Sequence, residues 1–314
     1  MPHKPAKQVI LGPLSHETVS SWLKNINTLN TRSAYRTDLI DFIEFFKIRS
    51  IDEFKKINRA NVIDWRDYLK GTPEKPGLAI RTVKRRMSTI SKFFEYLCDE
   101  NILETNTMIG VERPKLQANE GATGAINIFQ ARDLLNAPDI KTLKGKRDKA
   151  ILATFLFHAL RRSEVSHLKI KDIEERQGIK QFKVHGKGDK IRYVSLSHQA
   201  IPIILDYLDY AGHKNELESP LFLSLSNNSK NKRTYMTPIS IYNIVVFYGK
   251  KAGINMTKFS PHSLRSTAAT TALENGEDLR KVQDWLGHAN ISTTAMYDKR
   301  KTKPEDSPSF RVRY

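Results

Sequence analysis

A short run of polar residues near the C-terminus constrains this chain more than any other feature. The run consists of Pro261-His262-Ser263-Leu264-Arg265, then Leu286-Gly287-His288, and then Tyr297. Two histidines, an arginine and a tyrosine in one short stretch are hard to explain by packing, and they suit attack on a phosphodiester. The run therefore indicates a strand transferase that acts on DNA.

Local signals place these residues on or beside helices. Ser260 before Pro261 is a strong helix start, because serine can cap free N–H groups and proline suits the first helical position. His262 and Arg265 then share one face of the first turn, where free amides and the helix dipole favour a phosphate. We expect this helix to stop at Asn275-Gly276.

Two more helices are expected after this stop. One spans about 278–286, has apolar residues at core spacing and is ended by Gly287, so that His288 lies just past its end. Ser292 is the expected cap of the next helix, which begins at Thr293-Thr294 and leads to Tyr297. The hydroxyl of Tyr297 is the candidate nucleophile.

Residues 262–297, HSLRSTAATTALENGEDLRKVQDWLGHANISTTAMY, resemble the signature of the tyrosine recombinase (phage integrase) family. Ser266 stands where many members carry a histidine, a difference that we expect to matter little for catalysis. Upstream, HALRRSE at 158–164 resembles the first arginine box of the family, GLRxSE, and matches Arg161 to its arginine. Ala159 replaces the usual glycine, so we expect a turn whose conformation alanine accepts.

A hairpin is predicted within 182–194, FKVHGKGDKIRYV, because two alternating apolar runs flank a Gly-rich turn. The family resemblance places the catalytic lysine at Lys187, at the tip of this hairpin. Lys190 is a less favoured candidate for the catalytic lysine. Arg162 is expected to lie next to the catalytic arginine without binding the phosphate itself.

The resemblance also implies how the phosphate is bound. A phosphodiester is anionic, and guanidinium groups suit bidentate binding of its non-bridging oxygens, so Arg161 and Arg265 are expected to clamp it. His288 is expected to donate a hydrogen bond to the transferring phosphate. Glu164 is expected to orient the arginines.

Proton transfer is assigned to two further residues. A tyrosine has a pKa of about 10 and needs activation at neutral pH, for which His262 is the expected general base. Lys187 is the expected general acid for the leaving 5′ oxygen. By resemblance, the product is a covalent 3′-phosphotyrosine with a free 5′-hydroxyl, and a 5′-hydroxyl of a partner duplex reverses the step.

Composition agrees with a nucleic-acid partner. The net charge is +18 and the isoelectric point is about 9.8, and clustered Lys and Arg give affinity for phosphate of any sequence. The sequence has no GKS/T loop, HExxH motif or paired cysteines, so we expect no cofactor and no metal. Cys98 is the single cysteine, and neither a membrane-spanning run nor a signal peptide is evident, which predicts a cytoplasmic protein.

Apolar periodicity in the N-terminal half predicts four helices, at roughly 16–28, 31–47, 59–70 and 79–99. The fourth has an apolar stripe made of Val83, Met87, Ile90, Phe94 and Leu97. Its other face carries the candidate DNA-binding residues Arg81, Lys84, Arg85 and Lys92.

The expected fold is mainly α with a small β-sheet. It comprises a basic lead (1–13), a four-helix, SAM-like core-binding domain (14–100), a linker (101–124), an α+β catalytic domain (125–302) and a tail (303–314). By resemblance, the two domains form a C-shaped clamp on DNA. The alternating apolar and basic residues that end the tail suit an edge strand added to another protomer.

The favoured function is a site-specific recombinase that resembles a simple, two-domain, Xer-like family member. The expected nucleic-acid partner is double-stranded DNA with inverted-repeat core sites. On two such duplexes the chain is expected to form a tetramer, either with three further copies of itself or with a related recombinase. Accessory proteins are further expected partners. The alternatives are a non-catalytic DNA-binding protein of the same fold and a monomeric topoisomerase. Dimer resolution and movement of a mobile element both stay open as biological roles.

Overall fold

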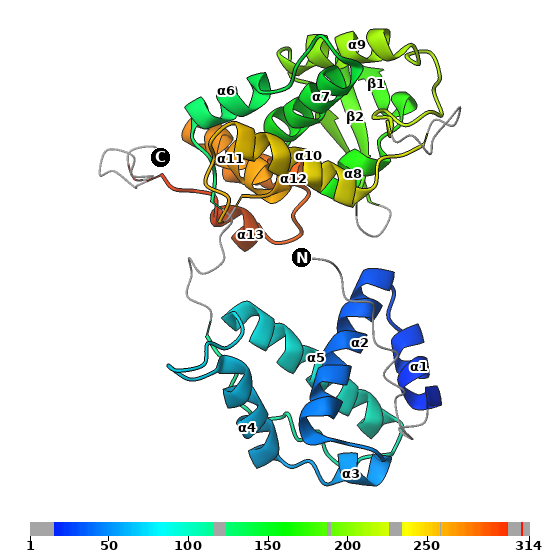
Figure 1. Cartoon of the computed structure of the whole chain (residues 1–314), viewed down its shortest axis with the longest axis vertical. Helices are drawn as coiled ribbons and strands as arrows, with labels where there is room; N and C mark the ends of the chain where they lie inside the picture. Colours follow the sequence, from blue (N-terminus) through cyan, green and yellow to red (C-terminus); the bar gives the residue numbers. More distant parts are fainter. Residues whose placement is uncertain are drawn as a thin grey trace. The chain divides into compact units, whose positions relative to one another are not determined.

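We describe the protein from a computed structural model, in residues 16–115, 124–186, 190–225, 234–257, 259–300 and 309. The chain divides into two compact units, Met1–Gly121 and Ala122–Tyr314 (Figure 1). Helices dominate both units, and a small sheet lies in the second, which confirms the predicted fold class. None of the helices within the described ranges is long and apolar enough to cross a membrane.

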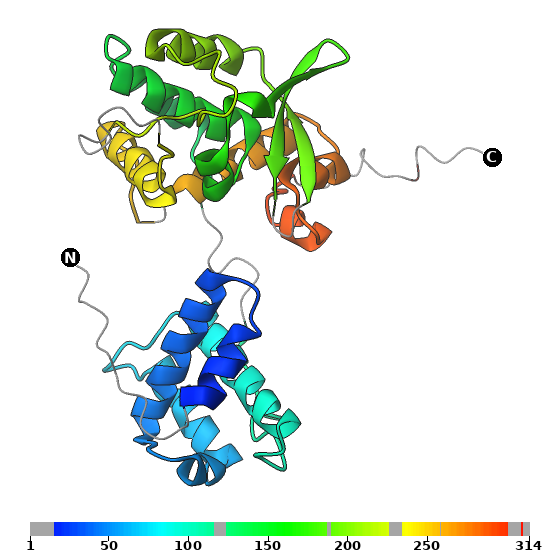
Figure 2. The same cartoon turned by 90° about the vertical axis from the view of Figure 1, so that its right-hand side faces the viewer.

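The named elements of the first unit, in its described part, are all helices joined by turns and loops (Figure 2). Its helices are α1 (His16–Lys24), α2 (Leu29–Phe46), α3 (Ile51–Lys55), α4 (Arg59–Lys70) and α5 (Ile80–Asp99). All four predicted helices are present, as α1, α2, α4 and α5. The prediction missed α3, which is too short for its periodicity to be recognised. Its start is fixed by Ser50, whose hydroxyl accepts a hydrogen bond from the amide of Glu53.

The core of this unit forms around α5. The predicted stripe of that helix is confirmed, since none of its five side chains is exposed to solvent. Phe42 of α2 packs edge-on against Trp65 of α4, with 4.9 Å between ring centroids, and also contacts Phe94 of α5. Burial of such large aromatic side chains supplies much of the stability of a small domain.

The second unit surrounds the central helix α7 (Leu143–His158), which packs against α6, α9, α10 and α11 (Figure 1). The other elements of this unit are α6 (Ile128–Asn136), α8 (Arg162–His167), η1 (Ile170–Asp172), β1 (Ile173–Arg176), β2 (Ile179–His185), β3 (Ile191–Ser195), α9 (Ala200–Ala211), α10 (Pro238–Lys251), α11 (Pro261–Glu274), α12 (Leu279–Leu286) and α13 (Ile291–Ala295).

The sheet is antiparallel with the strand order β1-β2-β3, and β2 and β3 form the predicted hairpin. In its register, Val184 lies opposite Arg192. The amide of Gly186 donates to the carbonyl of Lys190 at 2.8 Å and closes the paired part of the hairpin. The predicted lysine, Lys187, lies outside the described residues, as do the basic lead and nearly all of the tail.

The helix signals around the polar run are largely confirmed. Ser260 is the N-cap of α11 and its amide donates to the hydroxyl of Ser263, while Gly276 follows the helix with a φ of 94°. The expectation that Ser292 caps the next helix was wrong. The cap of α13 is Asn290, whose side-chain oxygen accepts from the amide of Ser292 at 2.9 Å.

The turn at Ala159 also differs from expectation. Ala159 ends α7 with φ 51° and ψ 32°, in the left-handed region, which costs an L-residue roughly 1 kcal/mol. Its methyl group is fully buried in a small cluster with Ala269 and Leu286, and that burial offsets part of the cost. This strained turn delivers the chain directly to Arg161.

Gly249 of α10 leaves room for the segment that leads into α11 to pack closely against this helix. A Cβ atom at this buried position of α10 would overlap the ring of Phe259, which precedes the N-cap of α11. We expect Gly249→Ala to lower the free energy of unfolding by about 1–3 kcal/mol, the usual cost of overpacking. Urea unfolding measures the change. Gly124→Ala, where a Cβ meets no atom within 4 Å, is the control and should be nearly neutral.

Candidate active site

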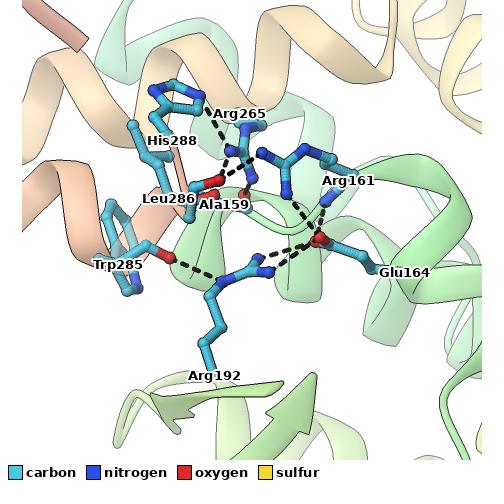
Figure 3. A network of polar contacts seen from close by, with 9 residues as sticks. Ala159, Arg161, Glu164, Arg192, Arg265, Trp285, Leu286 and His288 are labelled. Carbon is cyan, nitrogen blue, oxygen red and sulfur yellow. Dashed lines mark hydrogen bonds and ion pairs between the residues drawn. The ribbon is translucent and has the colours of Figure 1, made fainter. Parts of the chain in front are cut away.

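Arg265 lies at the centre of the site. It projects from the first turns of α11 and is only 2% exposed. Its guanidinium donates to the carbonyls of Ala159 and Leu286 and lies 3.1 Å from Nε2 of His288 (Figure 3). One buried cation thus joins the turn after α7 to the end of α12.

Arg161 enters the same cluster from the N-cap of α8. Its amide and its guanidinium donate to the two carboxylate oxygens of Glu164, at 2.7 and 2.8 Å. A second guanidinium nitrogen donates to the carbonyl of Gly287 at 2.8 Å. Glu164 therefore holds both the backbone amide and the guanidinium of Arg161. Arg162 points elsewhere, with its guanidinium 5.7 Å from the ring centre of Tyr242.

Arg192 of β3 is a member of this cluster that sequence reasoning missed. Both of its terminal nitrogens donate to Glu164, each at 2.8 Å, and its Nε donates to the carbonyl of Trp285 at 3.1 Å. A signal was present in the sequence. Arg192 shares its strand face with the buried Val194, and a charge on an inward face requires a partner.

The three arginines converge on the C-terminal turn of α12 (Figure 3). The carbonyls of Trp285, Leu286 and Gly287 each accept a hydrogen bond from a different arginine, in the order Arg192, Arg265, Arg161. These carbonyls carry the negative end of the helix dipole, so the cations are well placed there. The turn that precedes His288 is thereby fixed.

The cluster carries an excess of positive charge. Burial would raise the pKa of Glu164, but hydrogen bonds and charge from Arg192 and Arg161 outweigh it and hold this pKa at about 2. Burial lowers the pKa of Arg265 to about 9, and the neighbouring charge of Arg161 adds to the effect. Among the described side chains, no carboxylate forms an ion pair with Arg265. Three cations therefore face one carboxylate, and the site favours an anionic ligand.

Tyr297 lies beside this cluster, just past α13, and is 9% exposed. Its hydroxyl is 3.4 Å from Nε2 of His262, on the first turn of α11. Its ring stacks on that of His288, with 6.1 Å between centroids. The tyrosine therefore has a base within reach of its hydroxyl and the arginine-bound histidine against its ring.

His288 links the arginines to the tyrosine. Its Nδ1 lies 2.9 Å from the hydroxyl of Thr294, and burial, with the charges of Arg265 and Arg161, lowers its pKa to about 4. The ring is neutral at pH 7, and because Nε2 accepts from Arg265, its one N–H is on Nδ1 and donates to Thr294. Ser266, the departure from the family pattern, donates to the carbonyl of His262 at 3.0 Å and so stays within the helix.

The candidate DNA-binding residues of α5 are not equivalent. Arg81 and Lys92 are exposed, and Lys84 is half-buried. Arg85 forms an ion pair with the buried Asp38 of α2, although 44% of its side chain remains exposed. Lys92 lies 3.2 Å from the hydroxyl of Tyr35. Part of this basic face is thus engaged in tying α5 to α2.

His158 makes the stability of the second unit depend on pH. This fully buried histidine accepts a hydrogen bond from the amide of Ser197, and burial lowers its pKa to about 4. Its pKa in the unfolded chain is about 6.5, so the unfolded state binds more protons between these values. The free energy of unfolding should therefore fall by on the order of 3 kcal/mol as the pH drops from 6.5 to 4.

Urea unfolding at pH 7 and pH 4.5 measures this loss. His158→Gln should reduce the pH dependence, and the same change at the exposed His198 should leave it as it is. An equal pH dependence in all three proteins would contradict the assignment.

Known proteins share both the sequence pattern and the fold. Residues 126–303 match the phage integrase family, and residues 24–101 match the N-terminal SAM-like domain of phage integrases. Tyrosine recombinase XerC of Herpetosiphon aurantiacus is 33% identical over 274 residues, which cover 86% of this chain and 84% of that protein. Tyrosine recombinase XerD of Proteus mirabilis is 33% identical over 281 residues, covering 88% and 85% of the two chains.

Solved structures agree at the level of the fold. The XerH site-specific recombinase, in a post-cleavage complex with a palindromic difH substrate, has a TM-score of 0.68 at 24% identity, covering 86% of this chain and 76% of that one. A lambda integrase dimer bound to a COC′ core site also has a TM-score of 0.68, at 14% identity, covering 92% and 99%. The chain belongs to the phage integrase family of tyrosine recombinases, the enzymes of site-specific DNA recombination.

Proposed function

We propose that the protein cleaves and rejoins DNA strands at a specific site, with Tyr297 as nucleophile. The observation that carries this assignment is the buried, positively charged Arg265. It has no carboxylate partner among the described residues and contacts the histidine that stacks on Tyr297. A phosphodiester supplies the missing anion, and it would lie within reach of the tyrosine.

In the proposed step, the Tyr297 oxygen attacks phosphorus and the bond to the 5′ oxygen breaks. His262 takes the phenolic proton, which the 3.4 Å approach of its Nε2 supports. Arg161 and Arg265 stabilise the charge on the non-bridging oxygens. His288 donates to one of them once its proton has moved to Nε2, the nitrogen that accepts from Arg265 in this structure. Lys187 protonates the leaving 5′ oxygen, which completes the 3′-phosphotyrosine and the free 5′-hydroxyl.

DNA is the proposed partner, held by both units. The net charge of +18 and the exposed Arg81 and Lys92 on α5 support contact with the backbone. Inverted core sites then bring copies together in a tetramer on two duplexes, either of this chain or with a related recombinase. Rejoining to the second duplex needs only its 5′-hydroxyl.

The tail is the proposed link between neighbouring copies. The second unit has an apolar groove of about 490 Å³ between α6, α7 and α11, lined by Leu135, Leu156, Phe157, Ala272 and Trp285. The alternating apolar residues Phe310, Val312 and Tyr314 of a neighbouring tail suit such a surface. Deletion of 303–314 should leave strand cleavage intact and prevent assembly on two duplexes, and unimpaired assembly would exclude this role.

Covalent trapping tests the proposed function. The purified protein is incubated in EDTA with nicked genomic DNA fragments, denatured in detergent, and the DNA that stays attached is sequenced. We expect attachment at a discrete sequence. A protein that binds DNA tightly and forms no adduct would support the non-catalytic alternative.

A further inference from the structure

We infer that Arg192 is a positioning residue, which holds Arg161 in the orientation that binds the scissile phosphate. This inference rests on the proposed function of Arg161. Arg192 itself donates its hydrogen bonds to Glu164 and to Trp285, so it acts through these groups.

Both anchors of the Arg161 guanidinium depend on Arg192. The first anchor is Glu164, whose carboxylate receives two of its hydrogen bonds from Arg192. The second is the carbonyl of Gly287, two residues beyond the carbonyl of Trp285 that Arg192 holds. Arg161 has a side chain that is 38% exposed, whereas that of Arg192 is 14% exposed. The more buried arginine thus supports the one that faces solvent.

Packing around Gly287 strengthens this connection. Gly287 has a φ of 64°, and a Cβ atom there would lie 3.2 Å from Cδ of Arg192. The stem of Arg192 therefore packs directly on the turn that carries the Gly287 carbonyl. The arginine fork makes two parallel bonds to the carboxylate of Glu164 while its third nitrogen, Nε, donates to the carbonyl of Trp285, and lysine cannot replace this arrangement.

The position of Arg192 in the hairpin adds a second consequence. It lies on β3, opposite Val184 and one residue from the last pair of the hairpin, His185 and Ile191. Removal of Arg192 would free this strand from α12 and leave Glu164 buried with half of its donors. Arg161 would then lose its fixed direction while its own side chain stays intact.

The test uses the DNA duplex recovered by covalent trapping, synthesised with either a normal phosphate or a methylphosphonate at the scissile position. A methylphosphonate is uncharged there and has less need of an arginine. The proteins are the wild type, Arg192→Met, Arg192→Lys and Arg161→Ala. Arg176→Met is the matched control, since Arg176 is an exposed arginine of the same sheet that stacks on Tyr193.

We expect Arg192→Met to slow cleavage of the normal duplex about 100-fold, with DNA affinity close to that of the control. Its melting temperature should be lower than that of the control, because the buried Glu164 loses two donors, and cleavage is therefore measured well below it. Arg192→Lys should be nearly as slow. On the methylphosphonate, the defects of Arg192→Met and Arg161→Ala should both shrink to less than about tenfold.

Two results would overturn the inference, given a wild type that cleaves. One is normal cleavage by Arg192→Met. The other is a defect that persists on the methylphosphonate although that of Arg161→Ala shrinks, which would show a structural role only. A wild type that forms no adduct would instead contradict the proposed function.

Discussion

Tyr297→Phe is expected to abolish covalent attachment to DNA, by at least about 1,000-fold, and to leave DNA binding intact. The reaction loses its proposed nucleophile. The structural cost is low, because among the described residues the hydroxyl makes one long contact, 3.4 Å to Nε2 of His262, while the ring keeps its stacking on His288. Detergent-resistant protein–DNA complexes, resolved by electrophoresis, measure the loss.

Tyr235→Phe is the matched control, because Tyr235 is an exposed tyrosine of the same unit. It should form adducts like the wild type. Adducts that persist in Tyr297→Phe would mean that another side chain attacks the phosphate.

Arg265→Lys should slow cleavage by about 100- to 1,000-fold, the usual effect of removing one donor that stabilises charge in the transition state. Lysine keeps the charge but cannot reach the carbonyls of Ala159 and Leu286 while it also binds phosphate in a fork. Single-turnover cleavage at saturating protein separates this defect from weaker binding.

Arg280→Lys is the control for this change. Arg280 lies on α12 with a side chain that is 69% exposed and forms an ion pair with Asp284. Cleavage should be unaffected. If Arg265→Lys cleaved at the rate of the control, the assignment of Arg265 to the phosphate would be wrong.

Much of the site could be predicted because its signals are local. The cap at Ser260-Pro261 and the stop at Gly287 place Arg265 and His288 on neighbouring helix ends, and these boundaries depend on a few adjacent residues. The hairpin of β2 and β3 was also predicted correctly, because the Gly-rich turn and the apolar runs beside it are local signals. The family pattern then supplied the roles that spacing alone does not give.

Features that depend on distant contacts escaped prediction. Arg192 meets Glu164 across 28 positions of sequence and Trp285 across 93, and no local pattern encodes either partner. The left-handed turn at Ala159 also depends on distant contacts. The carbonyl of Ala159 accepts a hydrogen bond from Arg265, and its methyl group is buried. Tertiary contacts override local preference at both positions.

Mass spectrometry of the trapped complex tests the central claim most directly. The adduct is digested with nuclease and trypsin, and the peptide of residues 282–299, which contains Tyr297 as its one tyrosine, is fragmented to locate the added mass. The account predicts a nucleotide joined through its 3′-phosphate to Tyr297. A nucleotide on any other residue, or the same unmodified peptide from a complex that retains its DNA, would contradict it.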